Sequence, residues 1–150
     1  MGKIKSWFYK VLGRLLLDYS NKKIIKLNEE NHLFHKFMSN FEAKINIFTE
    51  NNEVTRSLVF DGNGEVSYHK NKVEEPDASL IFNSNKDFYK FIRSYGDVYE
   101  GMLENRFQLR GNLNVLFKYQ FLTNFFNPKR DKIEIENLKD TRTYIKRNNE

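Results

Sequence analysis

Residues 75–126 have the sequence EPDASLIFNSNKDFYKFIRSYGDVYEGMLENRFQLRGNLNVLFKYQFLTNFF, which predicts a strand, a capped helix, a second strand and a long apolar helix. After Pro76, which ends any preceding structure, apolar side chains at every second position predict the first strand over residues 78–82. Ser84 and Asp87 then form a Ser-x-x-Asp capping box. In such a box the serine oxygen accepts a hydrogen bond from an amide of the first helical turn, so a helix follows this strand directly.

The capped helix is short and amphipathic. Its apolar residues follow the spacing i, i+3, i+4 and i+7, at Phe88, Phe91, Ile92 and Tyr95. Gly96 is expected to end the helix, because glycine tolerates the positive φ of a helix C-terminus. A second helical stretch over residues 98–104 and a strand over residues 106–110 follow, and Gly111 ends that strand.

The final helix, expected over residues 113–126, is apolar on two sides. One stripe consists of Leu113, Phe117, Phe121 and Phe125, and the other of Val115, Tyr119, Leu122 and Phe126. Lys118 is its only charged residue. A helix with two apolar stripes needs cover on both, so we expect this one to be buried between other elements or to cover a hydrophobic ligand.

Residues 41–126 resemble the lipid-binding domain of the sterol carrier protein type two family, also called nonspecific lipid-transfer proteins. The resemblance lies in alternating strands, in Pro-Asp-Ala-Ser-Leu-Ile-Phe at residues 76–82, and in a helix that ends at glycine. It continues with Asn-Arg-Phe-Gln-Leu-Arg-Gly-Asn at residues 105–112, before an apolar helix. Asn105 stands where the family usually has glycine, and asparagine enters the left-handed region more readily than most residues.

The resemblance implies an apolar tunnel between the sheet and the helix of residues 113–126, with the helix of residues 88–95 as a second wall. The residues expected to line it are Phe82, Phe91, Ile92, Tyr95, Met102, Leu103, Leu109, Leu113, Phe117 and Phe121. Among these, Phe117 and Phe121 are expected on the stripe that faces the cavity. Ligand affinity would come from removing apolar surface from water, at roughly 25 cal/mol per Å². We therefore expect no catalytic residue, no cofactor and no metal.

The remaining strands are expected before this stretch. Alternation over residues 44–49 and 54–60 predicts a hairpin, and Asp-Gly-Asn-Gly at residues 61–64 predicts a second turn before a strand over residues 65–70. Strands followed by helices indicate an α+β fold. We expect an antiparallel or mixed sheet of about five strands, with helices packed on one face and an additional N-terminal amphipathic helix.

The length of 150 residues is sufficient for one substantial core, because such a chain buries roughly two thirds of its unfolded surface. We expect three segments: an N-terminal amphipathic helical segment over residues 1–40, the lipid-binding domain over residues 41–127, and a polar C-terminal tail over residues 128–150. The sequence has no cysteine, which excludes disulfides and thiol chemistry.

The N-terminus has the most regular apolar periodicity of the chain. Its apolar residues recur through four turns, at Ile4, Trp7, Phe8, Val11, Leu12, Leu15, Leu16 and Tyr19. One interpretation packs this stripe on the domain or on a second copy in a homodimer. The other is an interfacial helix that contacts an anionic membrane surface peripherally. The contacts expected for it are Lys3, Trp7, Phe8, Lys10 and Arg14. On this second interpretation, residues 1–20 determine where the domain works and are not needed for its folding.

The net charge of +5 is concentrated at the chain ends. Residues 1–26 contain seven Lys or Arg and one acidic residue. Residues 27–126 contain eleven Lys or Arg and fourteen acidic residues, and residues 127–150 contain seven Lys or Arg and five acidic residues. The central domain is mildly acidic, whereas a nucleic-acid reader carries its basic patch on the folded face that meets phosphate. We therefore expect no nucleic-acid partner. Without a long apolar run for a membrane span or a secretory signal, we expect a cytoplasmic protein, with peripheral membrane contact as an option.

Other patterns that carry chemistry are incomplete in this chain. Residues 61–65 space Asp, Asn and Glu like the first calcium ligands of an EF-hand, but Val66 stands where glycine is required. His32 and His35 lie three apart and near Glu29, but a closed zinc site needs four ligands, so we expect no metal there. The sequence contains neither a glycine-rich nucleotide motif nor a nucleophile elbow.

These patterns favour a non-catalytic protein that binds or carries a hydrophobic small molecule, such as a lipid, fatty acid or sterol-like compound, in an apolar tunnel. The alternative is a partner-binding scaffold domain whose cavity is filled by its own side chains, since the chain contains 14 phenylalanines.

Overall fold

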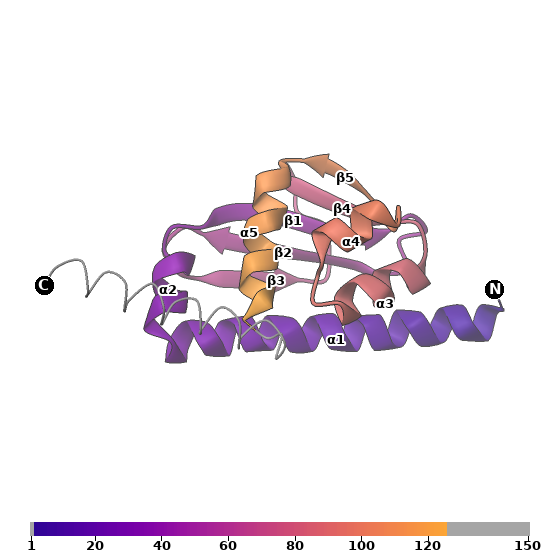
Figure 1. Ribbon diagram of the computed structural model, residues 1–150, viewed down its shortest axis with the longest axis horizontal. Helices are drawn as coiled ribbons and strands as arrows, with labels where there is room; N and C mark the ends of the chain where they lie inside the picture. The colour runs from indigo at the N-terminus through magenta and orange to yellow at the C-terminus, as the bar shows by residue number, and fades with distance from the viewer. Residues whose placement is uncertain (1, 126–150) are drawn as a thin grey trace, which may run out of the picture.

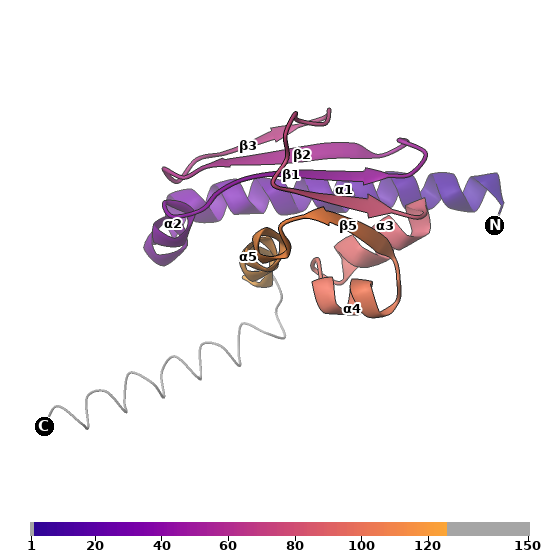
Figure 2. The same ribbon diagram turned by 90° about the horizontal axis from the view of Figure 1, so that it is seen from above.

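The computed structural model describes residues 2–125, which form a long helix, a five-stranded mixed sheet and shorter helices on one face of that sheet (Figures 1 and 2). The elements are α1 (Lys3–Glu30), α2 (His32–Met38), β1 (Glu42–Thr49), β2 (Thr55–Asp61), β3 (Val66–His69), β4 (Ala78–Phe82), α3 (Asn85–Arg93), α4 (Val98–Leu103), β5 (Phe107–Gly111) and α5 (Leu113–Asn124). The expected α+β class is confirmed. Phe126 and the tail of residues 128–150 lie outside the described residues.

The sheet has the strand order β3-β2-β1-β4-β5. Strands β1 and β4 run parallel, and the other neighbouring pairs are antiparallel. Ile47 of β1 lies opposite Arg56 of β2 and Leu80 of β4, and Leu80 lies opposite Leu109 of β5. Because residues directly opposite each other on neighbouring strands point to the same face of the sheet, these four positions share one face. The apolar side chains of that face form the core with the helices.

The crossover between β3 and β4 covers polar residues on the outer face of the sheet (Figure 2). The Asn46 side chain donates to the Val73 carbonyl at 3.0 Å and accepts from the Val73 amide at 2.9 Å. Ser57 Oγ donates to the Asn71 carbonyl at 2.7 Å. Asn46 and Ser57 are both buried. Since buried polar groups need partners, these bonds hold the crossover on the sheet.

Helix α3 begins as expected and ends earlier than expected. Ser84 Oγ accepts a hydrogen bond from the Asp87 amide at 3.1 Å, which confirms the predicted cap. The helix ends at Arg93, and Tyr95 and Gly96 then adopt positive φ values of 59° and 71°. Gly96 adopts the positive φ expected of a residue that ends a helix, and the structure places Tyr95 in the left-handed region as well.

Helix α5 packs on the sheet through a different stripe from the one expected. Its buried apolar residues are Val115, Leu116, Tyr119 and Leu122. Phe121 is 39% exposed, and its ring centroid lies 4.8 Å from that of Phe37 on α2. Phe121 therefore points toward α2 and solvent, whereas Phe117, the other residue expected on the cavity-facing stripe, is half-buried and packs against the core. The two stripes are similarly apolar, so composition could not distinguish the inner one.

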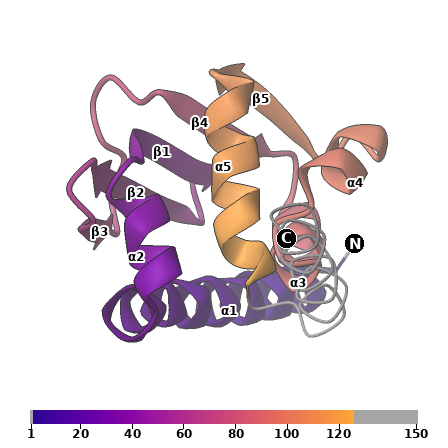
Figure 3. The ribbon, with the colours of Figure 1, turned by 60° about the vertical axis from the view of Figure 1, so that its left-hand side comes forward.

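Helix α1 runs along the edge of the molecule next to β3 and α3, with the end of α5 close to it (Figures 1 and 3). Its buried residues are Gly13, Leu17, Asn21 and Ile24. Leu17 and Ile24 belong to the same core as the strands, together with Phe34 and Met38 of α2. Leu17 is fully buried in this core, so residues 1–20 contribute apolar packing to the domain, which argues against the expectation that they are not needed for its folding.

Candidate functional site

Aromatic side chains fill the space between β4, β5 and α3, the helix expected to form the second wall of the ligand tunnel. Phe82 of β4 and Phe91 of α3, both expected to contact ligand, are fully buried, with ring centroids 5.2 Å apart. Phe107 of β5 lies 5.6 Å from the Phe82 centroid and 5.4 Å from the Phe91 centroid. Rings at these separations are in direct contact, so these three side chains leave no ligand-sized space between them.

Most of the other expected lining residues lie at the surface or at the edge of the core. Met102 and Leu103 of α4 are exposed, Leu103 to 84%. The half-buried residues that pack against the core are Leu109, Leu113 and Phe117. Phe121 borders a surface groove beside Phe37. The structure therefore does not bring all the expected residues into one cavity.

Ile92 and Tyr95, however, lie together in a groove between α1 and the end of α3. Its volume is about 490 Å³, within the range of small-molecule sites. The lining residues are Leu16, Tyr19, Ser20 and Lys23 from α1, and Ile92, Arg93 and Tyr95 from α3 and the turn after it. A void of about 10 Å³ shares Ser20, Ile92 and Tyr95 and reaches Leu17 and Tyr119. The groove thus combines apolar walls with two cationic residues and extends toward the core.

Tyr95 is held at this groove in a conformation that few non-glycine residues adopt. Its φ is 59°, in the left-handed region. Thr123 Oγ1 of α5 donates to the Tyr95 carbonyl at 2.6 Å, and the Gly96 amide donates to the Phe91 carbonyl at 3.0 Å. These bonds fix the turn between α3 and α4.

A second apolar surface lies on the side of α1 that faces away from the core. Residues two apart on a helix lie on nearly opposite sides, so Leu15 points outward where Leu17 points inward. The exposed apolar residues of this surface, here called the outer face of α1, are Ile4 at 84%, Phe8 at 52%, Leu15 at 61% and Tyr19 at 57%. Trp7 is also exposed, near the start of the helix. Much of the expected N-terminal stripe is therefore directed away from the domain.

The cations expected to contact a membrane differ in their placement. Lys3 is exposed, whereas Lys10 and Arg14 are half-buried. Lys10 Nζ lies 3.8 Å from a carboxylate oxygen of Glu53, in the turn between β1 and β2. Lys5 and Lys22 are also exposed on α1. Among the helices of residues 2–125, none has the length and apolar character needed to cross a bilayer.

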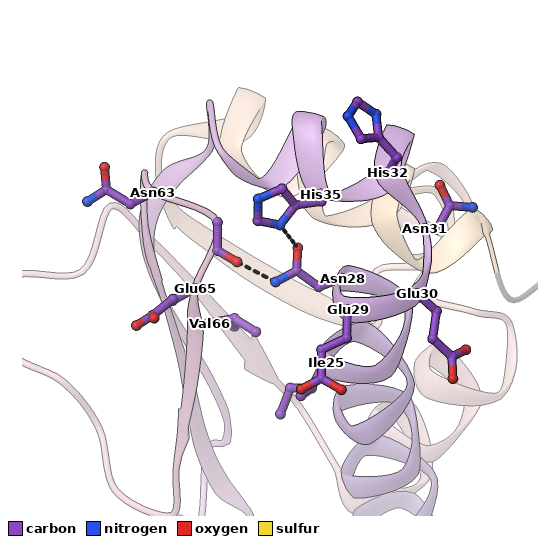
Figure 4. A pocket seen from close by; sticks show the side chains of 11 residues that line it. Ile25, Asn28, Glu29, Glu30, Asn31, His32, His35, Asn63, Glu65 and Val66 are labelled. Atoms are coloured by element: carbon purple, nitrogen blue, oxygen red, sulfur yellow. Dashed lines mark hydrogen bonds between the residues drawn. The ribbon is translucent and has the colours of Figure 1, made fainter.

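His32 and His35 border a polar hollow of about 710 Å³, where the β2–β3 turn meets the C-terminal end of α1 (Figure 4). The Asn28 side chain donates to the Gly64 carbonyl, and its oxygen lies 3.1 Å from His35 Nδ1. Figure 4 shows His35 directed toward Asn28 and His32 directed away from it. Within residues 2–125, no three His, Asp or Glu side chains form a group that could hold a metal ion. Asn28 thus links the turn to α1.

The turn itself uses Asp61 as an internal hydrogen-bond acceptor. Asp61 Oδ1 accepts from the amides of Asn63 and Glu65, at 2.8 and 3.0 Å. These bonds stabilise the carboxylate and hold the pKa of Asp61 below its usual value. The segment that resembles a calcium loop in spacing is therefore a hairpin turn, as the Val66 position predicted.

A polar cluster ties α1 to the sheet. The Arg56 guanidinium, which is nearly fully buried, lies 3.3 Å from Asp18 Oδ1 and donates to the Tyr68 hydroxyl at 2.7 Å. The Tyr68 hydroxyl donates to Asp18. Burial, assisted by this bond, raises the pKa of Tyr68, and burial also raises the pKa of Tyr119. Both phenols are therefore neutral at physiological pH, and the cluster is a structural link.

The sequence did not predict that Lys23 and Arg93 line the groove between α1 and α3. Helix α1 continues to Glu30, so Lys23 lies in the same helix as Leu16, two turns further on. The regular apolar periodicity of the N-terminus could have been extended to Ile24 and would have predicted this length. Nothing in the sequence indicates which side of α1 meets α3, because that depends on a close approach between the two helices.

No protein-family model matches the sequence, and no curated protein matches it. Among solved structures, the UbiJ-SCP2 ubiquinone synthesis protein is similar with a TM-score of 0.53 and 10% identity, over 71% of this chain and 94% of that chain. A sterol carrier protein-2 like-3 from Aedes aegypti has a TM-score of 0.49 and 19% identity, over 76% and 96% of the two chains. Sterol carrier protein domain 2 of Helicoverpa armigera has a TM-score of 0.49 and 16% identity, over 71% and 83%. The chain therefore has the fold of sterol carrier protein type two-like domains.

Proposed function

We propose that this chain is a non-catalytic lipid-binding protein that works at the surface of an anionic membrane. The observation that carries the proposal is the outer face of α1, where Ile4, Phe8, Leu15 and Tyr19 are all more than half exposed. Contiguous exposed apolar surface on a folded protein marks a site of interaction with a partner or a membrane. A helix that also packs on the domain through its inner side presents this surface in a fixed orientation.

The charge distribution supports a bilayer as the occupant of the outer face. Residues 1–26 contain seven Lys or Arg against one acidic residue, and each cation near an anionic leaflet contributes about 1 kcal/mol to binding. A second copy of the chain on this face would instead bring the same cations together. Charge therefore favours a membrane over a homodimer through this surface.

The fold supports lipid as the ligand class, because several matched structures are named as sterol carrier proteins. The packing of Phe82, Phe91 and Phe107 argues against carriage of a lipid in a tunnel between these rings. The groove between α1 and α3 is open and is a better candidate for the lipid site. A non-catalytic role agrees with both features, since binding by apolar contact needs no reactive side chain.

A partner-binding scaffold is the second candidate, and the filled interior favours it. Such a domain would keep the fold while its own rings occupy the internal space. One matched structure is named as the UbiJ-SCP2 ubiquinone synthesis protein, so the fold also occurs in a protein that is named for ubiquinone synthesis. On this candidate, the outer face of α1 would contact another protein.

Sedimentation with vesicles tests the proposal. We expect the protein to sediment with vesicles that contain phosphatidylglycerol, to release at high salt, and to remain in solution with vesicles of phosphatidylcholine alone. The variant Phe8→Ser/Leu15→Ser should lose sedimentation without a change in melting temperature, because both residues are exposed. The matched control is Leu33→Ser/Leu103→Ser, which removes two exposed leucines elsewhere and should still sediment.

Two outcomes would contradict the proposal. If Phe8→Ser/Leu15→Ser sediments as well as the unmodified protein, the outer face does not contact the bilayer. If the unmodified protein is a dimer that this variant dissociates, and it ignores anionic vesicles, the outer face belongs to a second copy.

A further inference from the structure

We propose that the groove between α1 and α3 binds a single-chain amphiphile with an anionic headgroup, of the fatty-acid class. This inference rests on the proposed lipid-binding function and names the ligand and its site. The groove is defined by Leu16, Tyr19 and Lys23 on α1 and by Ile92, Arg93 and Tyr95 at the end of α3.

The walls of the groove suit an alkyl chain. Leu16 and Tyr19 are three residues apart on α1, so their side chains lie side by side. Ile92 is 8% exposed and forms a floor that the core supports from behind. Tyr19 and Tyr95 leave part of their rings open to solvent, and covering such apolar surface drives ligand binding. The groove therefore offers a chain two aromatic walls and an aliphatic floor.

The rim of the groove suits an anionic headgroup. Lys23 Nζ lies 5.0 Å from the centroid of the Tyr19 ring, a cation–π distance that keeps the ammonium near the groove. Arg93 is exposed in the last turn of α3 and carries a planar fork of donors that matches a carboxylate. Two cations beside apolar walls complement a carboxylate with an alkyl chain and disfavour a cationic amphiphile.

The backbone at Tyr95 is an independent pointer to the same groove. A left-handed φ of 59° costs a tyrosine free energy that glycine would not lose. Glycine follows directly at position 96, so the turn does not require an aromatic residue at position 95. Costly backbone conformations often lie at ligand sites, and this one places the Tyr95 ring on the wall of the groove.

The groove also adjoins the proposed membrane surface. Tyr19 belongs both to the outer face of α1 and to the lining of the groove. When the outer face lies on a bilayer, the groove opens beside the lipid surface. A single-chain amphiphile can then move between bilayer and groove with little exposure of its chain to water.

Binding of dansyl-undecanoic acid and of its methyl ester, measured by fluorescence on the full chain without vesicles, tests the inference. We expect the acid to bind roughly tenfold more tightly than the ester, because two cations meet only the acid's charge. Lys23→Gln/Arg93→Gln should reduce the acid's affinity to that of the ester and leave the ester's affinity unchanged. The matched control Lys44→Gln/Lys70→Gln removes the same charge from exposed positions in β1 and directly after β3, and should change neither affinity.

A second pair of variants separates binding from folding. Tyr95→Gly relieves the left-handed conformation, so the melting temperature should not fall, while the affinity for both probes should drop. Glu75→Gly relieves a φ of 49° in an exposed loop and should leave both affinities unchanged. Unchanged acid affinity in Lys23→Gln/Arg93→Gln, or unchanged affinity for both probes in Tyr95→Gly, would overturn the inference.

The two proposals fail separately. Loss of probe binding in the groove variants with intact sedimentation on anionic vesicles supports the groove as a site distinct from the membrane surface. If the unmodified protein binds neither probe but sediments with anionic vesicles, only the groove inference is overturned. If it binds the probes but ignores the vesicles, only the membrane proposal is overturned.

Discussion

Gly13 of α1 lies so close to Phe88 of α3 that a Cβ added to the glycine would come within 2.6 Å of the phenylalanine ring. Phe88 is fully buried, and its ring centroid lies 5.5 Å from that of Phe82, so the ring has little room to move. The two helices approach this closely because position 13 has no side chain. This contact sets the distance between α1 and α3 and therefore the shape of the groove between them.

Gly13→Ala should destabilise the protein by about 1 kcal/mol. Alanine gains about 1 kcal/mol of helix propensity, but overpacking against a fixed ring costs about 1–3 kcal/mol. Urea unfolding measures the balance, and Gly13→Ala/Phe88→Leu should be less unstable than the sum of its single variants. A Gly13→Ala protein more stable than the unmodified one would show that the helices adjust freely.

Leu17→Ala should cost about 2–5 kcal/mol of unfolding free energy, because Leu17 is fully buried in the core. Leu15→Ala makes the same chemical change on the outer face of α1, where the side chain is 61% exposed, and should cost less than about 0.5 kcal/mol. Thermal unfolding compares the two. Equal losses would mean that the outer face is also covered.

Asp18→Ala should cost about 1–3 kcal/mol, because it removes the carboxylate partner of the buried Arg56 guanidinium. The Asp18 side chain is 36% exposed, so water moderates the loss. Asp18→Ala/Arg56→Met removes the buried charge as well and should recover part of the stability. Denaturant unfolding of the unmodified protein, Asp18→Ala, Arg56→Met and the double variant measures this coupling. A double variant whose loss of unfolding free energy equals the sum of the two single losses would contradict this account.

Stability should decline as pH rises above about 10, the usual tyrosine pKa. Burial raises the pKa of Tyr119 and of Tyr68 in the folded protein, so the unfolded chain loses these protons first and unfolding becomes more favourable. Tyr119→Phe should make the alkaline decline shallower in urea unfolding at a series of pH values. Tyr99→Phe, at an exposed position, should leave the alkaline decline in unfolding free energy unchanged. The same decline in the unmodified protein, Tyr119→Phe and Tyr99→Phe would exclude Tyr119 as its cause.

Local signals predicted much of the fold. The strand predicted at residues 78–82, the Ser84 cap and the left-handed conformation at Asn105, whose φ is 50°, agree with the structure, although all five residues of β4 are buried and not only every second one. Each depends on neighbouring residues only. The parallel pairing of β1 with β4 was not specified, because it depends on where the crossover packs and not on the strands themselves.

The sequence was less informative about which apolar surfaces are buried. Leu15 and Leu17 are chemically identical, yet one is exposed and the other lies in the core. Likewise, the two stripes of α5 could not be ranked from composition. Ile92 and Tyr95 were predicted as lining residues and do lie in a groove, but Lys23 joins them only through the packing of α1 on α3.

Trp7 fluorescence gives the most direct test of the membrane proposal. Trp7 is the single tryptophan of the sequence and is 57% exposed near the outer face of α1. On titration with phosphatidylglycerol vesicles at low salt, its emission should shift to shorter wavelength and be quenched by brominated lipid, and both changes should reverse at high salt. Emission that stays at the solvent-exposed wavelength throughout the titration, with no quenching by brominated lipid, would contradict the proposal that α1 contacts a membrane.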